Sequence, residues 1–298
     1  MAHEFAYVNG KIVPVAEAAV SAHDRSFLYG DGAFDTAVAR RGRVFKLEPH
    51  IDRLFRSLAV LRIPPPLPKA DLREAALDLM RRNGMVDGFI RMVVSRGTCA
   101  YISLDPRTVT GGPTLVMLTR GAEPPSEVGP IHGRASGARA VTASIRKTPT
   151  ASLESRVKAN NYLNSILARW EAIDAGVDEA ILLDARGSVT EGTGDNLFTV
   201  VRDRLLTPPA LNILEGITRE TILALAPRAG LRPEVRELTP YDLYTADEVF
   251  LTSTVVGVLP IVEVDGRPIG TGVPGPAALR LQALYDEVVV AEGTPLNR

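Results

Sequence analysis

A polar loop changes into an amphipathic helix at the stretch KANNYLNS, residues 158–165. Apolar residues then recur at helical spacing as far as Gly176, which is expected to end the helix. If the helix starts at Asn160 or Asn161, Lys158 projects from the preceding loop near the positive end of the helix dipole. That field, together with burial, would lower the pKa of the amine and favour nucleophilic attack, although an ordinary exposed lysine near a helix cap is the commoner case. The apolar face of this helix consists of Tyr162, Leu163, Ile166, Leu167, Trp170 and Ile173.

Lysine is scarce in this chain. It occurs only at positions 11, 46, 69, 147 and 158, and the other basic residues among the 34 are arginines. An amine can lose its proton and attack a carbonyl carbon, whereas a guanidinium stays protonated. The positions that keep lysine are therefore candidates for chemistry that arginine cannot perform, although most of them need no such explanation.

The composition is that of an ordinary globular protein of 298 residues. Lys and Arg number 34 against 35 Asp and Glu, so no basic field favours a nucleic acid or a membrane surface. Cys99 is the single cysteine, which excludes an internal disulfide and a cysteine-based zinc site. No secretory signal is visible, and no apolar run reaches the ~18 residues of a membrane span. We therefore expect a cytoplasmic protein without a metal site, a nucleic-acid partner or a membrane.

Two α+β domains are predicted, with a ligand cleft between them. Residues 1–120 form the smaller N-terminal domain with an antiparallel sheet, 121–137 an interdomain linker rich in Gly, Pro and Ser, and 138–298 the larger C-terminal domain. The first domain begins with a hairpin that turns at Asn9-Gly10. Its two helices carry the apolar stripes Ile51, Leu54, Phe55, Leu58 and Leu61, and Leu72, Ala75, Ala76, Leu79 and Met80. The remaining predicted strands are 32–40, 44–47, 89–95, 114–119, 138–145, 179–183, 188–191, 196–201, 205–207, 249–254 and 258–264, and the remaining helices are 216–226 and 275–290.

Four more features could bind a ligand, although each also has an ordinary structural interpretation. Glu191 stands at the end of a predicted strand before two glycines, where a ligand can approach the backbone closely. The free amides of Ile217 and Thr218, which follow Gly216 at the start of a helix, make an anion site. The hydroxyls of Thr252, Ser253 and Thr254 point to the same kind of anion, and Arg53 on the first helix could bind a phosphate.

Together these residues supply an amine, an acid, a phosphate site and an arginine. Pyridoxal phosphate needs a Schiff-base lysine, a carboxylate for its pyridinium nitrogen and an anion site for its phosphate. Dinucleotides and nucleoside triphosphates are disfavoured, because the sequence contains neither a G-x-G-x-x-G motif nor a Walker loop.

The chain resembles the class IV (fold-type IV) pyridoxal-phosphate aminotransferases over almost its whole length. The resemblance rests on KANNYLNS at 158–165, EGTGDNLF at 191–198, GITR at 216–219, YGDGAF at 29–34 and HIDRL at 50–54, in the order found in that family. It implies a two-domain α+β fold like that of D-amino acid aminotransferase, usually as a homodimer. It also implies that the C-terminal domain binds the cofactor.

The resemblance also implies a role for each matching residue. Lys158 would carry pyridoxal phosphate as a Schiff base and act as the base that moves the substrate's α-proton. Glu191 would keep the ring nitrogen protonated, and Tyr162 would hydrogen-bond to the ring hydroxyl. The phosphate would be bound by Arg53, the amides of Ile217 and Thr218, and the Ser253-Thr254 hydroxyls.

Within the family, the chain is most similar to the L-branched-chain aminotransferases. This similarity implies that Arg91 organises the site for the substrate carboxylate and that Tyr29, Phe34 and the Thr254-Val255 turn line the pocket. Two departures point to a broadened specificity. Phe89 stands where that group has a tyrosine, and Asp35-Thr36 where it commonly has Glu-Gly, so that Thr36 narrows one side of the pocket.

The expected reaction moves an amino group from a branched-chain L-amino acid to a 2-oxo acid such as 2-oxoglutarate. Two alternatives use the same cofactor: transamination of an (R)-amine or a D-amino acid, and cleavage of 4-amino-4-deoxychorismate. The Arg-x-His pair typical of the D-amino acid enzymes is not evident at residues 96–100. A third alternative, a cofactor-free scaffold, would need none of Lys158, Glu191 and Arg53.

Overall fold

The computed structural model describes residues 4–121 and 136–296. Contacts divide the chain into unit 1 (Met1–Glu123, Val157–Asn161 and Val289–Arg298) and unit 2 (Pro124–Arg156 and Tyr162–Val288). Residues 157–161 and 289–298, which the sequence places in the second domain, thus belong to unit 1. The predicted linker falls almost entirely on 122–135, outside the described residues.

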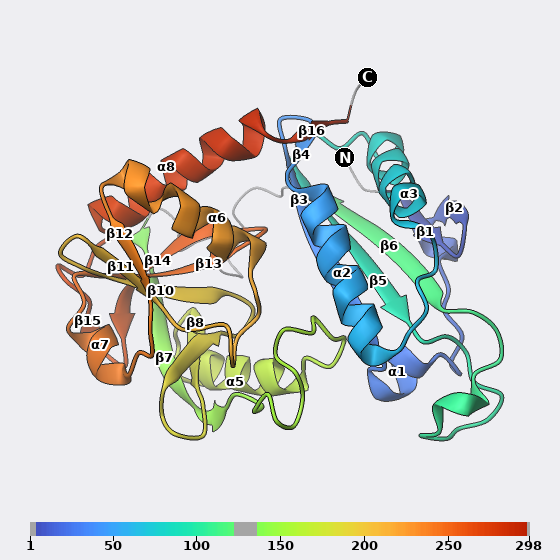
Figure 1. Ribbon diagram of the computed structural model, residues 1–298, viewed down its shortest axis with the longest axis horizontal. Helices are drawn as coiled ribbons and strands as arrows, with labels where there is room; N and C mark the ends of the chain where they lie inside the picture. Colours follow the sequence, from blue (N-terminus) through green and yellow to red (C-terminus); the bar gives the residue numbers. More distant parts are fainter. Residues whose placement is uncertain (1–3, 122–135, 297–298) are drawn as a thin grey trace. The chain divides into compact units, whose positions relative to one another are not determined.

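Unit 1 is built on a seven-stranded antiparallel sheet in the order β16-β4-β3-β5-β6-β1-β2 (Figure 1). The predicted hairpin is confirmed, since Asn9 and Gly10 have φ values of 45° and 92°, as a tight type I′ turn requires. The strand predicted at 44–47 is present but shorter: it covers Arg43–Val44 and pairs with β3, and the chain starts a helix at Leu47. The strands are β1 (Phe5–Val8), β2 (Lys11–Pro14), β3 (Gly32–Arg40), β4 (Arg43–Val44), β5 (Gly88–Ser95), β6 (Thr114–Gly121) and β16 (Thr294–Pro295).

The helices α2 (Leu47–Leu61) and α3 (Lys69–Arg82) pack against this sheet, and the short helix α1 (Arg25–Tyr29) precedes β3. Side chains alternate between the two sides of a strand, so Ala33, Asp35 and Ala37 of β3 turn toward α2. Both predicted helical stripes are confirmed, because their members are buried in one core or packed against it. The core includes Ile51, Leu54, Leu58, Leu72, Ala76, Leu79, Met80, Ile90 and Met92.

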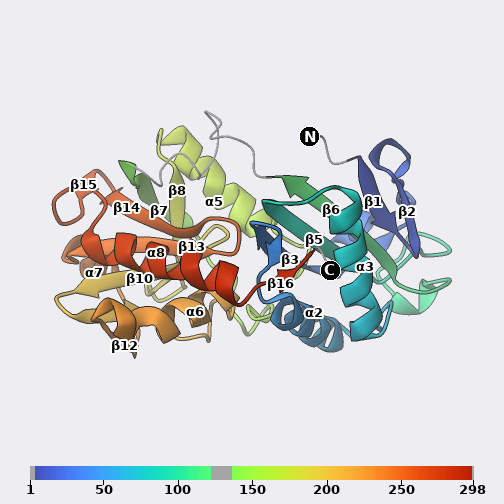
Figure 2. The ribbon, with the colours of Figure 1, turned by 90° about the horizontal axis from the view of Figure 1, so that it is seen from above.

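Unit 2 contains a nine-stranded mixed sheet (Figure 2). Its order is β12-β11-β10-β13-β14-β7-β8-β9, and β9 also pairs with β10, so the strands from β10 to β9 form a closed ring. The predicted strands are confirmed, with ends that move by one or two residues. They are β7 (Ala138–Arg146), β8 (Glu179–Leu183), β9 (Val189–Gly192), β10 (Asn196–Val201), β11 (Arg204–Thr207), β13 (Glu248–Ser253) and β14 (Gly257–Val264), joined by β12 (Arg232–Val235) and β15 (Arg267–Pro268).

The helices of unit 2 are α5 (Leu163–Asp174), α6 (Ile217–Leu225), α7 (Pro240–Tyr244) and α8 (Pro276–Ala291). The helices predicted at 216–226 and 275–290 are confirmed as α6 and α8. Helix α5 starts at Leu163 rather than at Asn160 or Asn161.

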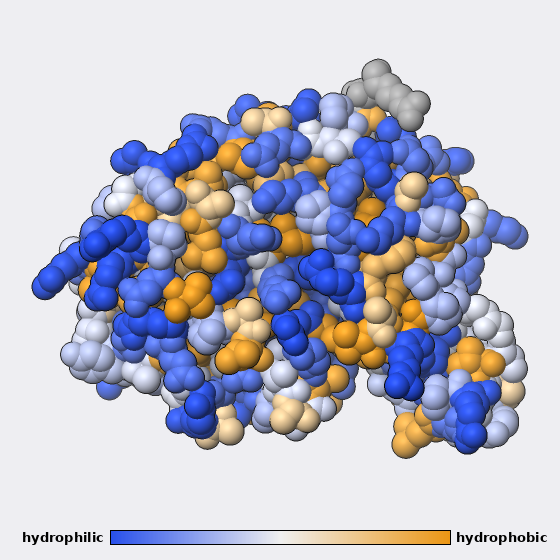
Figure 3. Space-filling model, in the orientation of Figure 1, coloured by the Kyte–Doolittle hydropathy of each residue, from blue (hydrophilic) through white to orange (hydrophobic). Residues whose placement is uncertain are grey.

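The two sides of α5 differ sharply. Ala168 and Ala172 are fully buried against β7 and β8. The large apolar residues on the other side are 46–60% exposed: Leu163, Ile166, Leu167, Trp170 and Ile173. Elsewhere, on the face drawn in Figure 3, hydrophobic residues are scattered among hydrophilic ones. Across the two described ranges, no helix is both long and apolar enough to cross a membrane.

Candidate active site

Lys158 lies on an extended segment that joins the edge of β3 in unit 1. Phe34 N donates to Lys158 O (2.9 Å), Asn160 N donates to Gly32 O (2.9 Å), and Lys158 N donates to Ser57 Oγ (3.2 Å). Gly32 permits this approach, because a Cβ there would collide with Asn160 Nδ2 and with a backbone oxygen of the neighbouring strand. Backbone pairing with β3 therefore positions Lys158.

Arg53, the predicted phosphate ligand, is a buried residue of α2 held by Asp35. Its Nε donates to Asp35 Oδ2 (2.8 Å) and its Nη2 donates to Asp35 Oδ1 (2.9 Å). His50, one helical turn earlier, places Nδ1 2.7 Å from Asp35 Oδ1, and Thr36 N donates to the same oxygen (2.7 Å). The side chains of Asp35, His50 and Arg53 are at most 4% exposed. A bidentate pair of this kind fixes the plane of a guanidinium.

The charges in this cluster follow from their surroundings. Burial would raise the pKa of Asp35, but Arg53 and His50 outweigh it and hold that pKa far below its usual value. Burial lowers the pKa of His50, and the nearby cations Arg53 and Lys158 lower it further, against the opposing effect of Asp35. A neutral His50 whose Nδ1–H donates to the carboxylate satisfies both groups.

The predicted substrate residues of unit 1 gather on the side of the sheet opposite α2. Thr36 is directly opposite Arg91 in the β3–β5 pairing, so both project from the same side as Phe34 and Phe89. The Phe34 ring lies 4.3 Å from Arg91 Cζ and 4.7 Å from Lys158 Nζ, both measured to its centroid. Thr36 Oγ1 is buried and has no hydrogen-bond partner among the described atoms. Tyr29 ends α1, with Arg25 Cζ 5.0 Å from its ring centroid.

In unit 2, Glu191 lies on β9 beside a second lysine. Lys147 Nζ donates to Glu191 Oε1 (2.5 Å), and these side chains are 18% and 8% exposed. On the other oxygen, Oε2 accepts from Asn196 Nδ2 (3.2 Å) and from Leu214 N (3.1 Å). Glu191, Asn196 and Thr252 lie opposite one another on neighbouring strands.

The N-terminus of α6 is close to this carboxylate. Ile217 and Thr218 begin the helix, and Gly216 at the N-cap offers no side chain to cap their amides. Asn196 Nδ2 also donates to Leu214 O (2.9 Å), and a Cβ at Gly216 would collide with Asn196 Oδ1. Asn196 thus connects Glu191 to the segment that leads into α6, and uncapped amides at a helix start suit an anion.

The other predicted residues of unit 2 lie on turns. Ser253 is the last residue of β13, and Thr254 and Val255 lie in the turn to β14. Because Thr252 pairs with Asn196, this turn continues from the strand position beside Glu191. Tyr162 is the N-cap residue of α5.

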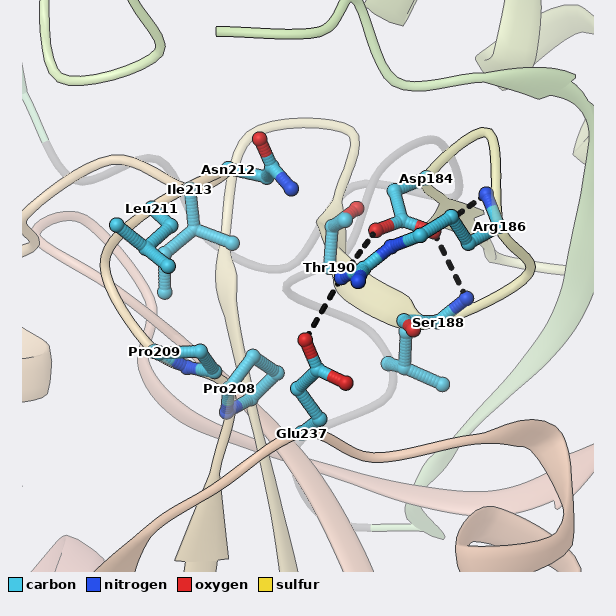
Figure 4. Close-up of a pocket in the computed structure, with 11 residues that line it drawn as sticks. Asp184, Arg186, Ser188, Thr190, Pro208, Pro209, Leu211, Asn212, Ile213 and Glu237 are labelled. Atoms are coloured by element: carbon cyan, nitrogen blue, oxygen red, sulfur yellow. Dashed lines mark hydrogen bonds and ion pairs between the residues drawn. The ribbon is translucent and has the colours of Figure 1, made fainter.

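Unit 2 also contains a small pocket. Figure 4 shows Arg186 reaching Glu237 (2.7 Å) and Asp184 (3.5 Å) on one side, with Leu211 and Ile213 on the other. Its volume is about 30 Å³, enough for water but far below that of a pocket for a small molecule. It is therefore no candidate for the substrate site.

The sequence interpretation missed four residues: Asp35 and His50 in unit 1, and Lys147 and Asn196 in unit 2. It considered Asp35 only as a departure from the Glu-Gly pair of the branched-chain enzymes, and the structure shows its side chain turned toward α2. A signal existed, because an acid between Ala33 and Ala37 in an otherwise apolar strand needs a buried partner, and His50 and Arg53 share a helix face. The scarcity of lysine was the corresponding signal for Lys147.

Comparison with known proteins gives consistent relatives. The family model for class IV amino-transferases matches residues 32–264. A Methanocaldococcus jannaschii protein named "Putative branched-chain-amino-acid aminotransferase" is 43% identical over 283 residues, which is 95% of each chain. A D-alanine aminotransferase of Bacillus licheniformis is 32% identical, over 95% of this chain and 96% of its own.

A solved structure agrees with these relatives. The T.th. branched-chain amino acid aminotransferase, complexed with N-(5′-phosphopyridoxyl)-L-glutamate, has a TM-score of 0.89 and 34% identity. The match covers 96% of this chain and 94% of that one.

Proposed function

The chain belongs to the class IV aminotransferase family, and on that premise we propose that it is a pyridoxal-phosphate-dependent transaminase for branched-chain L-amino acids. The resemblance read from the sequence and the expected fold are confirmed by the family match and the solved relative. The observation that carries the substrate class is the 43% identity to a relative of that name across 95% of both chains. Its second substrate is a 2-oxo acid such as 2-oxoglutarate.

The residues of the candidate site fit this cofactor. Glu191 is a buried carboxylate with room for one more donor, which suits a ring N–H, and the uncapped start of α6 suits a phosphate. Bound pyridoxal phosphate supplies the electron-accepting ring that stabilises negative charge at the substrate's α-carbon. Lys158 holds it through its amine and moves the proton at that carbon.

The other assignments concern binding. Arg53, whose plane Asp35 fixes, binds the phosphate together with the amides of Ile217 and Thr218 and the hydroxyls of Ser253 and Thr254. Tyr162 donates to the ring hydroxyl. Arg91 organises the site for the substrate carboxylate, and the side chain of the substrate lies among Tyr29, Phe34, Thr36, Phe89 and Val255.

Initial rates test this function directly. With 2-oxoglutarate as acceptor, we expect L-leucine to react faster than D-alanine or (R)-1-phenylethylamine. Activity that persists without any 2-oxo acid would contradict transamination. Borohydride treatment of protein supplied with pyridoxal phosphate, followed by peptide mapping, should place the label on Lys158.

A second candidate is transamination of D-amino acids. One observation favours it: the relative named D-alanine aminotransferase is 32% identical in sequence to this protein, in an alignment that covers 95% of this chain. A rate with D-alanine above that with L-leucine in the same assay would establish it.

We also propose a homodimer in the cytoplasm. The exposed apolar side of α5 is a surface that a second copy would cover: its large residues, Trp170 among them, are about half exposed. The lone Cys99 and the lack of a charge bias agree with the location. Light scattering should give a molar mass of twice that of the chain. For the Trp170→Glu variant, the molar mass should fall to that of a single chain.

A further inference from the structure

Lys147 is the feature that the proposed function leaves unused. It is one of five lysines, it is 18% exposed, and Glu191 is its ion-pair partner at 2.5 Å. It holds Oε1, whereas Asn196 and the Leu214 amide hold Oε2. Two donors on Oε2 already fix the orientation of the carboxylate, so Lys147 is not needed to orient it.

The acceptor positions of Glu191 show where a ring nitrogen can bind. A carboxylate has about four lone-pair positions, two on each oxygen. On Oε2 both are taken by Asn196 and Leu214, and on Oε1 Lys147 takes one. The less occupied oxygen, to which we assign the ring N–H, is therefore Oε1, which already accepts from Lys147.

Two cations would then share one carboxylate oxygen. Like charges that share a partner at a partly buried site repel one another, because water screens them less there than at an exposed site. Arg219 is a further buried cation that interacts electrostatically with Glu191. Its charge is present in the wild type and in every Lys147 variant, so it does not contribute to the difference between them. We propose that Lys147 is a positioning residue that acts through Glu191: it weakens the hold of this carboxylate on the protonated ring nitrogen of the cofactor.

This inference rests on the proposed function, because it takes Glu191 as the partner of the ring nitrogen. For the removal of Lys147, it predicts a change in ligand binding opposite to the change expected if this lysine had only a structural role. A lysine that only supported the fold would, when removed, weaken the binding of every ligand. Lys147 as a competing charge would, when removed, strengthen the binding of a ligand with a protonated ring nitrogen.

Equilibrium binding to cofactor-free protein tests the proposal at pH 8. The probes are pyridoxine 5′-phosphate, which has no aldehyde to react with Lys158, and its analogue with C–H in place of the ring nitrogen. The ratio of their dissociation constants measures the contribution of the nitrogen alone. Lys147→Met should raise the preference for the nitrogen-containing probe about tenfold, and the ring nitrogen should lose its proton at a pH about one unit higher.

Controls separate charge from other effects. Lys147→Arg keeps the charge and should leave the preference unchanged. Lys69→Met removes a lysine from an exposed pair with Asp52 at the same 2.5 Å distance and should also leave it unchanged. If Lys147→Met does not fold, Lys147→Gln keeps a donor for Oε1 without the charge and should give the same increase.

The outcomes are distinct. An unchanged or reduced preference in the folded methionine or glutamine variant, with normal binding by the wild type, overturns the role of Lys147 alone. Wild-type protein that binds neither probe overturns the proposed cofactor, and this inference with it.

Discussion

Asp35 of unit 1 and Glu191 of unit 2 are both buried carboxylates, but their surroundings differ. Asp35 is fully buried and receives four hydrogen bonds from the chain, three on Oδ1 and one on Oδ2: two come from Arg53, one from His50 and one from the Thr36 amide. Glu191 receives three, and one position on Oε1 stays available. A carboxylate that is fully buried among its own chain's donors can only hold its neighbours, whereas one with an acceptor position left for another donor can bind a ligand. The first should affect stability most and the second activity.

The largest effect should come from removing the amine of Lys158. Lys158→Ala keeps every hydrogen bond described above for Asp35 and Glu191, and we expect kcat with L-leucine to fall about 10⁴-fold or more, since the nucleophile and base is lost. The midpoint of urea unfolding should stay near that of the wild type. Lys69→Ala, at an exposed lysine, is the control and should keep its activity; appreciable turnover by the Lys158 variant would contradict the assigned chemistry.

Asp35→Asn tests the structural side of the comparison. It removes the negative charge that Asp35 places beside the buried guanidinium of Arg53, so the free energy of unfolding should fall by about 3–5 kcal/mol, a large share of the ~5–15 kcal/mol of a typical domain. Urea unfolding of the cofactor-free protein measures it. Asp52→Asn breaks an exposed pair and should cost less than about 1 kcal/mol. If Asp35→Asn and Asp52→Asn lost the same free energy of unfolding, Asp35 would have no special role in stability.

Glu191→Gln tests the functional side. A glutamine still accepts a hydrogen bond but carries no charge for the ring nitrogen, so kcat should fall about 10²–10³-fold. The free energy of unfolding should change less than in Asp35→Asn, because Lys147 is partly exposed and can be hydrated. Steady-state rates and urea unfolding of the same preparation check both statements, and a variant with wild-type kcat would show that the free position is unused.

The smallest effect should be a pH dependence of stability in the Asp35 cluster. The pKa of His50 is lower in the folded protein than in the unfolded chain, chiefly because of burial, so the unfolded chain takes up its proton first. The free energy of unfolding should therefore fall as the pH drops below about 6.5, by at most ~1.4 kcal/mol per pH unit.

Asp35 should act at lower pH. Its pKa is depressed, so its stabilising contribution is present above about pH 4 and is lost on further acidification. Between about pH 4 and 6.5 the decline should thus come from His50 within this cluster. In His50→Asn, whose amide replaces the Nδ1 donor without titrating, the slope in that interval should flatten, and an unchanged slope would point to another group.

Local patterns predicted most elements of the fold. The Asn9-Gly10 turn and the stripes of α2 and α3 are encoded within a few residues of one another, and the structure contains all of them. The stripe of α5 has the same spacing, yet its large residues are exposed and Ala168 and Ala172 pack on the sheet. Periodicity predicts a helix, but it does not specify what covers each side.

The candidate site was predicted where a motif is contiguous. Lys158, Glu191 and the start of α6 each lie in a recognisable run of residues, and their roles stay predictions until they are tested. The pairings were not predicted. Arg53 meets Asp35 from 18 positions away, and Lys147 meets Glu191 from 44. Pairings over such separations are set by the sheet topology, which a local pattern does not contain.

The way unit 1 is assembled from separate stretches of chain has a consequence for biosynthesis. Its edge strand β16 pairs with β4, Leu296 is buried in its core, and Arg81 Nε donates to Leu296 O (2.7 Å). These residues leave the ribosome after the whole of unit 2. Unit 1 therefore begins to be synthesised first but is completed last. On the ribosome, all residues of unit 2 are available for folding while the sheet of unit 1, with which the Lys158 segment pairs, still lacks strand β16.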